Sequence, residues 1–288
     1  VDSYLLRSDT PRRDGNNLAK DLLVAWKDDE WTVSGEYATV QPNFNPEVGF
    51  VRRTNNVQYS ADLAWNPLIR RSAAIRNLKF AESYDYYQNA LSRQFETRTY
   101  ETTAGVQFEN NGSITLVSNQ SYDRLVAPFA IRSNTVIPVG DYQSTRYTAS
   151  LNSGNNRRLG MTASAARGGF WSGTNTAYTA GLTARPNYHL NIDLSYSRND
   201  VTLPVRNGRF TTGLVGAKIV YGFTPRAFFN AFLQYNADTH QVSSNLRFDF
   251  IHHPLSDLYV VYNDRRDTTG RLLLERALIV KLTHLLNF

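Results

Sequence analysis

Apolar and polar residues alternate one by one along most of this chain. In residues 188–197, YHLNIDLSYS, apolar side chains fall on one set of positions and polar side chains on the other. The same period of two recurs in residues 57–65, 145–152 and 242–250. Successive side chains of a strand point to opposite sides of the sheet, so this period is typical of strands with unlike faces. No helical spacing competes over a comparable length, and the sequence therefore predicts an all-β chain.

Turn signals rich in Gly, Pro, Asn and Asp divide the alternating segments into sixteen expected strands. Those strands are 1–7, 19–26, 31–41, 55–65, 76–86, 94–108, 112–124, 141–152, 157–167, 174–185, 187–198, 209–221, 225–236, 241–252, 256–264 and 277–288. Short connections such as KDDE (27–30) alternate with long ones such as residues 41–53 and 126–141. Short turns at one end of the strands and long loops at the other are typical of a transmembrane β-barrel.

Two architectures need strands with one apolar face. A soluble sandwich buries that face, whereas a membrane barrel turns it toward lipid and closes its backbone hydrogen bonds around a polar lumen. Aromatic residues of the apolar face gather at the strand ends, with Ala, Leu, Val and Ile between them. The short-turn end has Trp26, Trp31, Trp65, Tyr188, Tyr221, Phe250 and Phe288, and the long-loop end has Tyr84, Tyr122, Tyr196, Tyr235 and Tyr262.

Two aromatic belts around an aliphatic band match the two interfaces of a membrane, whereas a sandwich core would favour aromatics at strand centres. We therefore expect one domain over residues 1–288, a transmembrane antiparallel up-and-down β-barrel of the bacterial outer membrane. The apolar side chains Leu190, Ile192, Leu194, Phe248 and Leu282 should face outward. The alternative is a soluble sandwich or solenoid.

Composition narrows the chemistry further. The chain has no Cys, so thiol catalysis, disulfides and Cys-ligated metals are excluded. No apolar run approaches the roughly 18 residues of a transmembrane helix. The chain opens on VDSYLL rather than on Met with an apolar leader, from which we expect a removed signal peptide or a fragment.

The last residues, KLTHLLNF (281–288), resemble the assembly signal at the end of bacterial outer-membrane proteins. A polar residue, a small residue two places later and apolar residues ending on an aromatic make up that signal, and Thr283 stands where Gly is more usual. The matching residues are Lys281, Thr283, Leu286 and Phe288. The resemblance implies insertion by the barrel assembly machinery, with the final strand lying in lipid as far as Phe288.

Three further segments, residues 1–8, 44–53 and 252–267, resemble a barrel family of unknown function. Its members typically carry a carbohydrate-binding-like module of family 9 type before the barrel, and strands also precede the segment that VDSYLL resembles. The resemblance implies that sixteen strands are a lower bound and that a carbohydrate ligand could be bound through an upstream module. Because no reaction is established for the family, the resemblance implies a fold and a location but no catalytic residue in this chain.

Residues that could carry chemistry have simpler interpretations. His252 and His253 are adjacent on a strand end and should point to opposite sides, which suits a polar turn better than a metal site. His240 adjoins Asp238 in a loop, but no G-x-S-x-G accompanies them. Residues 264–271, DRRDTTGR, lack the ligand order of a Ca²⁺ loop. We expect no enzyme activity, no cofactor and no metal site.

The basic balance, a net charge of +6, raises the question of a nucleic-acid partner. The arginine pairs are scattered over both ends of the strands, and no basic helix or stacking platform accompanies them, so we expect no nucleic acid. Plain solubility and anchoring at the interface explain these pairs. The two pairs expected in long loops, 52–53 and 265–266, could also bind lipopolysaccharide phosphates. Outer-membrane lipids are the other expected partner. The pairs are 52–53, 70–71, 157–158 and 265–266.

The polar face predicts a wet interior lined by charges of both signs. Its candidates are five acids, Glu36, Asp62, Glu101, Asp193 and Asp249, and six bases, Lys79, Arg146, Arg185, Lys218, Arg247 and Lys281. Opposite charges there can pair across strands. Barrels of about 16 strands are wide enough for a channel unless something plugs them. We expect a pore or passive transporter for oligosaccharides or other small solutes. The alternative is a non-conducting barrel that anchors a binding module or joins a larger envelope complex.

Overall fold

The computed structural model describes residues 1–13, 15–47, 49–154, 157–270 and 272–285. Every regular element in these ranges is a strand, and eighteen strands are present there. They are β1 (Asp2–Arg7), β2 (Leu18–Lys27), β3 (Trp31–Val40), β4 (Asn56–Trp65), β5 (Ile75–Asn89), β6 (Phe95–Phe108), β7 (Ser113–Leu125), β8 (Phe129–Arg132), β9 (Thr135–Ile137), β10 (Gly140–Asn152), β11 (Leu159–Phe170), β12 (Gly173–Ala184), β13 (Leu190–Thr202), β14 (Arg209–Thr224), β15 (Ala227–Asn236), β16 (Gln241–His253), β17 (Ser256–Asp267) and β18 (Leu273–Leu282).

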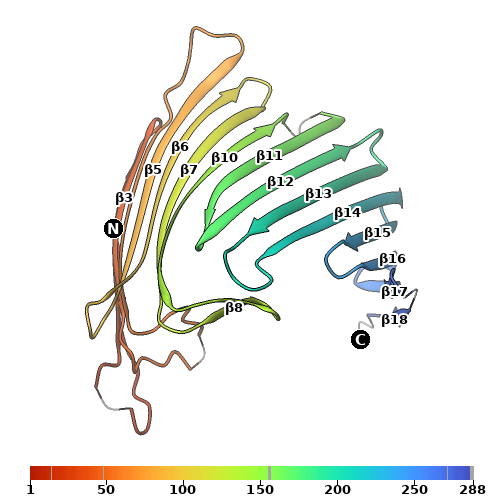
Figure 1. The fold of residues 1–288 in the computed structure, drawn as a ribbon. Coiled ribbons are helices and arrows are strands. Elements are labelled where there is room, and N and C mark those ends of the chain that lie inside the picture. Colours follow the sequence, from red (N-terminus) through yellow and green to blue (C-terminus); the bar gives the residue numbers. More distant parts are fainter. Residues whose placement is uncertain (14, 48, 155–156, 271, 286–288) are drawn as a thin grey trace.

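Sixteen of the strands form one sheet in which each strand pairs with its neighbours in sequence order, interrupted only by β8 and β9. All pairings are antiparallel, so the sheet is an up-and-down meander that curves like the wall of a barrel (Figure 1). Among the described residues, β1 pairs only with β2 and β18 only with β17. The predicted all-β, up-and-down barrel class is confirmed. No apolar helix of membrane-spanning length occurs in the described ranges.

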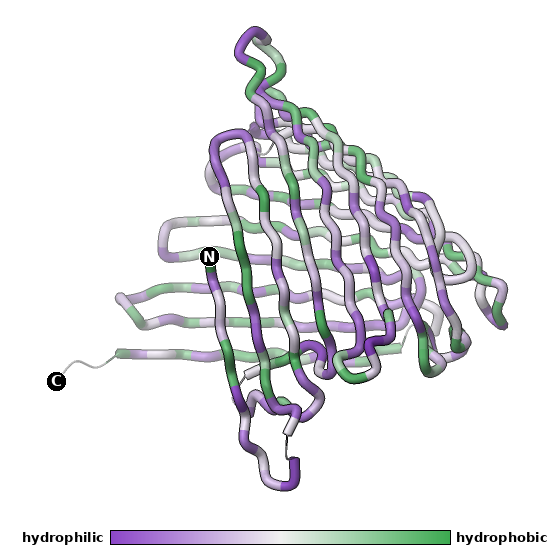
Figure 2. Tube along the Cα trace, turned by 90° about the vertical axis from the view of Figure 1, so that its left-hand side faces the viewer, coloured by the Kyte–Doolittle hydropathy of each residue, from purple (hydrophilic) through white to green (hydrophobic). Residues whose placement is uncertain are grey.

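Each of the sixteen expected strands has its counterpart in this sheet. The period of two is visible along the chain, where hydrophobic and hydrophilic residues alternate within single strands (Figure 2). Polar turn residues separate the strands as expected. In the β2–β3 turn the carboxylate of Asp28 accepts hydrogen bonds from the N–H groups of Glu30 (2.9 Å) and Trp31 (2.6 Å), which closes the turn.

Two expectations about the strands need correction. The final strand was expected to run to residue 288, but β18 ends at Leu282. Beyond it, the N–H of Thr283 still donates to the Asp257 carbonyl (2.8 Å), whereas Leu286 and Phe288 lie outside the described residues. Residues 126–141 were expected to be a loop, but they contain β8 and β9, which pair with each other as a separate hairpin.

The connections lie at two ends of the sheet. One end has the longest connections, residues 8–17, 41–55 and 126–139, of which the last carries the β8–β9 hairpin. The opposite end has shorter turns such as 28–30, 225–226 and 254–255. The expected asymmetry between the two ends is therefore present, although the turn between β11 and β12, at the long-loop end, is also short. We call these the long-loop end and the short-turn end.

Candidate functional site: the concave face and its inserted hairpin

The strand register decides which side chains share a face of the sheet. Residues that pair across antiparallel strands point to the same side. Asp62 pairs with Ser83, which pairs with Glu101, and Glu101 pairs with Asn119, which pairs with Arg146. This face extends from β3 to β18 through further pairs of the same parity. It carries ten of the predicted lumen residues: Glu36, Asp62, Lys79, Glu101, Arg146, Asp193, Lys218, Arg247, Asp249 and Lys281.

The eleventh candidate, Arg185, follows the end of β12. Its Nε donates a hydrogen bond to Oδ1 of Asn191 (3.1 Å), so it belongs to the turn at the short-turn end rather than to a strand. The remaining ten share one surface, as the alternation predicts.

This polar face is the concave one. The β8–β9 hairpin lies within the curve of the sheet (Figure 1), and its residue Ile137 packs against Val201 of β13. In the register Val201 shares its face with Asp193. Farther along the sheet, the β3–β4 loop residue Arg52 lines a hollow together with Glu36 of the same face. Two long connections thus fold inward over the polar surface.

The acids of the concave face bind hydroxyl and amide groups more often than cations. The carboxylate of Asp62 accepts hydrogen bonds from Ser34 (3.0 Å) and Ser83 (2.7 Å). Asp193 accepts one from Thr183 (2.7 Å), and Glu101 accepts one from Asn119 (3.2 Å). These three described acids therefore bind neutral side chains, and none of them shows the charge pairing across strands that the sequence predicted.

One ion pair of this face lies along a single strand rather than across two, and it joins Arg247 and Asp249 on β16. Nε of Arg247 lies 2.7 Å from Oδ2 of Asp249, and the guanidinium also lies over the ring of Tyr259. Asp249 is only 1% exposed, and its Oδ1 has no hydrogen-bond partner. Removing Arg247 would leave a buried carboxylate uncompensated, so this arginine is a structural group as well as a wall charge.

Other described cations of the concave face are not neutralised by a neighbouring carboxylate. Among the described residues, Lys79, Arg146 and Lys218 take part in no ion pair within 4.0 Å. Lys218 and Arg247 line a hollow of about 570 Å³ with the amide of Asn230 and the ring of Phe232. This part of the wall thus combines positive charge, an amide group and an apolar ring.

The β8–β9 hairpin is the part of the site that the sequence did not predict. Ile137 is fully buried and packs with Val201 and Leu203, forming a small core between the hairpin and the β13–β14 connection. Beside it, the hydroxyl of Thr135 donates to the backbone carbonyl of Asn207 (3.0 Å). The hairpin is therefore fixed to the far side of the curve by apolar packing and a partly buried hydrogen bond.

A second attachment holds the tip of the hairpin. The guanidinium of Arg132 lies 2.6 Å from the carboxylate of Asp238, in the β15–β16 turn, and 4.6 Å from the ring centre of Phe210. The sequence marks Asp238 only as a neighbour of His240, whereas in the structure its carboxylate pairs with Arg132 of this hairpin. The hairpin thus reaches from the β7–β10 connection to those of β13–β14 and β15–β16, across the long-loop end of the interior.

The opposite, convex face is apolar and carries aromatic rings near both ends of the strands. Toward the short-turn end, Trp65 stacks between Trp31 and Phe80, with ring centres 5.6 and 5.7 Å away. Toward the long-loop end a second row of rings runs along neighbouring strands, with centres between 4.4 and 6.2 Å apart. This row consists of Tyr37, Tyr59, Tyr86, Phe95 and Tyr122.

The residues expected to face outward do lie on this convex side. Leu194 and Leu282 are 43% and 69% exposed, and Leu190, Ile192 and Phe248 share their face by register. In the described ranges the only other sheet is the β8–β9 hairpin, which lies on the concave side. The apolar face is therefore uncovered by protein, and the soluble sandwich alternative is excluded.

The other candidates from the sequence fall elsewhere. His284 lies beside His252, with ring nitrogens 3.4 Å apart, but no group of described His, Asp and Glu side chains is arranged to hold a metal ion. Arg53 contacts Glu96 and lies over the ring of Tyr87. Two other arginines lie within β17 rather than in a loop: Arg265 pairs with Glu275 and Arg266 with Asp264.

The sequence matches no family model and no curated protein. Among solved structures, the chain is similar to the siderophore receptor PirA from Acinetobacter baumannii, with a TM-score of 0.39 and 12% sequence identity. The aligned region covers 92% of this chain and 63% of the receptor, so the chain spans less than two thirds of that protein. The function is therefore argued from the residues of this chain alone.

Proposed function

We propose that this chain is a barrel of the bacterial outer membrane that lets small polar solutes pass through an aqueous interior narrowed by the β8–β9 hairpin. The observation that carries the proposal is the contrast between the two faces. A convex surface that exposes Leu, Val, Ala and aromatic side chains over the whole sheet is unsuitable for water. The concave surface carries hydroxyl, amide and charged groups, which suit an aqueous path.

The distribution of aromatic and aliphatic residues on the convex face matches the layers of a bilayer. Aromatic rings near both ends of the strands match the two interfacial regions, and the aliphatic residues between them match the hydrocarbon layer. Strand pairing satisfies the backbone groups inside the sheet, as a membrane requires. The proposed partners are therefore membrane lipids, lipopolysaccharide at the long-loop end, and the barrel assembly machinery.

The proposed solutes are polar molecules of either charge. Acids and bases both occur along the concave wall, so neither cations nor anions are strongly excluded. The oligosaccharide substrates, the upstream binding module and the additional strands remain predictions from the family resemblance.

The test is reconstitution of the full chain into planar bilayers. Stepwise conductance with weak ion preference is the expected result. A chain that stays in solution without detergent and does not float with liposomes would refute the membrane assignment. A chain that inserts and folds but conducts nothing, either with or without residues 129–137, would refute the pore and favour the anchoring role. If conduction appears only after residues 129–137 are replaced by a short Gly-Ser link, the hairpin is a plug rather than a constriction.

A further inference from the structure

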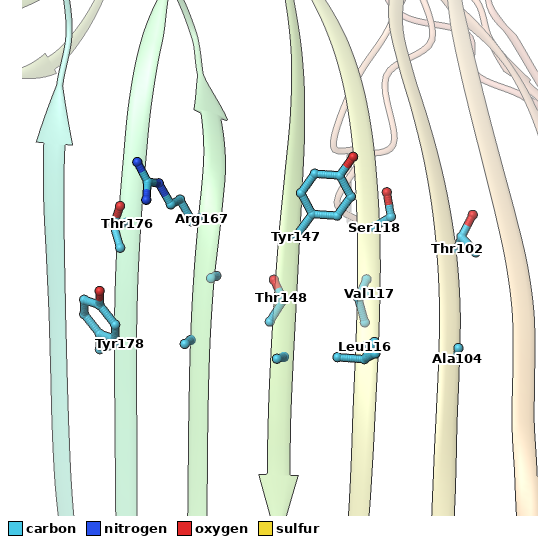
Figure 3. A pocket seen from close by; sticks show the side chains of 13 residues that line it. Thr102, Ala104, Leu116, Val117, Ser118, Tyr147, Thr148, Arg167, Thr176 and Tyr178 are labelled. Atoms are coloured by element: carbon cyan, nitrogen blue, oxygen red, sulfur yellow. The ribbon is translucent and has the colours of Figure 1, made fainter.

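A hollow interrupts the convex face on strands β6, β7, β10, β11 and β12 (Figure 3). Its floor is formed by small side chains, Ala104, Ala149 and Ala165, beside Leu116. These four residues pair in sequence across neighbouring strands and so share the convex face. The hollow measures about 470 Å³, and its lining is mainly apolar.

Two tyrosines flank this hollow. Tyr147 on β10 and Tyr178 on β12 stand on either side of β11, and their rings project from the face where the alanines do not (Figure 3). A smooth barrel wall would be filled at these positions by Leu or Val. Alanines between two aromatic rings instead leave an open groove with a mainly apolar lining.

The rim of the groove toward the long-loop end is polar. Ser118, Tyr147, Arg167 and Thr176 are cross-strand neighbours in one row, one pairing step beyond the alanine row. Arg167 leans toward Thr176 at the edge of the hollow (Figure 3). The groove thus changes from apolar to hydrogen-bonding groups over a single step, as the border between lipid chains and headgroups does.

Two other arginines of the convex face toward this end, Arg198 and Arg124, are paired with carboxylates, whereas Arg167 pairs with none that the structure describes. Arg198 lies 3.0 Å from the carboxylate of Asp200, and Arg124 lies 2.7 Å from that of Asp141. Among the described residues, no acid lies within 4.0 Å of Arg167. Its cross-strand neighbours are uncharged. An exposed guanidinium without a carboxylate, above an apolar groove, is suited to an anion that carries its own apolar chain.

We infer that this groove binds a phosphorylated glycolipid of the outer leaflet, with an acyl chain over the alanines and a phosphate on Arg167. The hydroxyl groups of Ser118 and Thr176 would donate to the same headgroup. The inference rests on the proposed outer-membrane function, because only an embedded barrel turns this face toward lipid. It specifies which part of the surface holds the lipid and which cation selects the headgroup.

The test uses the full chain, purified in detergent and incubated with lipid A, with retained lipid counted by native mass spectrometry. Wild-type protein should retain lipid A, and lipid A stripped of its phosphates should be retained about tenfold less. Arg167→Gln should reduce retention of the phosphorylated lipid to a similar extent. Ala165→Leu, which fills the groove, should reduce retention of both lipids.

Ala180→Leu is the matched control, since Ala180 lies on the convex face but outside the groove. This variant should retain lipid A as the wild type does. Equal retention by wild type and Arg167→Gln, or no preference for the phosphorylated lipid, would overturn the inference. Liposome flotation is measured on each protein: an embedded wild type without lipid preference defeats only this site, whereas a wild type that does not float defeats the proposed function as well.

Discussion

The β8–β9 hairpin gives the most direct access to function, because its attachment can be weakened without touching the sheet. The variant of choice is Ile137→Ala. Ile137 is 0% exposed and packs against Val201 and Leu203. Replacing a buried Ile with Ala in a well-packed core costs about 2–5 kcal/mol. The main sheet does not include β8 or β9, so this loss should fall on hairpin docking rather than on the barrel.

The size of the effect follows from the docking equilibrium. Each 1.4 kcal/mol changes an equilibrium about tenfold, so the lower end of that range raises the undocked population roughly 30-fold. Arg132→Ala should act more weakly. Its ion pair with Asp238 is partly exposed, which limits the pair to about 0.2–1 kcal/mol, and its contact with Phe210 adds roughly as much.

Single-channel recording measures the result. Ile137→Ala should show longer or more frequent high-conductance states than the wild type, with Arg132→Ala between the two. Val136→Ala is the control, because Val136 neighbours Ile137 on β9 but is 46% exposed. The chain contains no Cys, so a spin label on Val136→Cys can report hairpin mobility without background. Unchanged conductance in Ile137→Ala, together with increased label mobility, would refute the idea that the hairpin narrows the path.

Three further predictions address the wall, the end of the chain and the aromatic belt. Arg146→Glu combined with Lys79→Glu should shift reversal potentials toward cation selectivity, and unchanged selectivity would mean that these side chains do not line the ion path. Phe288→Asp should lower the amount of folded barrel in outer-membrane fractions, and normal levels of heat-modifiable protein would remove the assembly signal from the reasoning. Trp65→Ala loses two ring stacks, each contributing about 0.5–1.5 kcal/mol, and should lower the denaturant midpoint. Tyr188→Ala should lower it less, because Tyr188 is 93% exposed and its ring contacts that of the adjacent His189.

The alternation of residue types was sufficient to predict the sixteen strands of the sheet and the shared face of ten of the eleven candidate lumen residues, all except Arg185. That success has a physical reason: a strand with one lipid face and one polar face must repeat every two residues, and a one-residue slip would exchange the faces. Arg265 and Arg266 were assigned to a loop because polar residues occupy both faces of β17 near its end. There the period no longer distinguishes a strand from a connection.

The β8–β9 hairpin could not be predicted in this way. Its strands have four and three residues and lie between Pro128 and Pro138, which resembles an ordinary loop. What holds it is packing against residues far along the chain, and alternation carries no information about such partners. The same limit applies to the concave wall, where the pattern placed Asp62 and Glu101 on one face but could not show that they bind serine and asparagine side chains.

The meander has a consequence for the route by which the molecule reaches its native state. Every strand of the sheet pairs with a neighbour in the chain, so wall formation needs only small loop closures and can proceed hairpin by hairpin. The contact between Arg132 and Asp238 is different, because it spans 106 positions and requires β15 and β16 to be in place. If the hairpin narrows the path as proposed, the wall is completed before the interior is obstructed, and a newly assembled barrel would pass through a short-lived, more permeable stage.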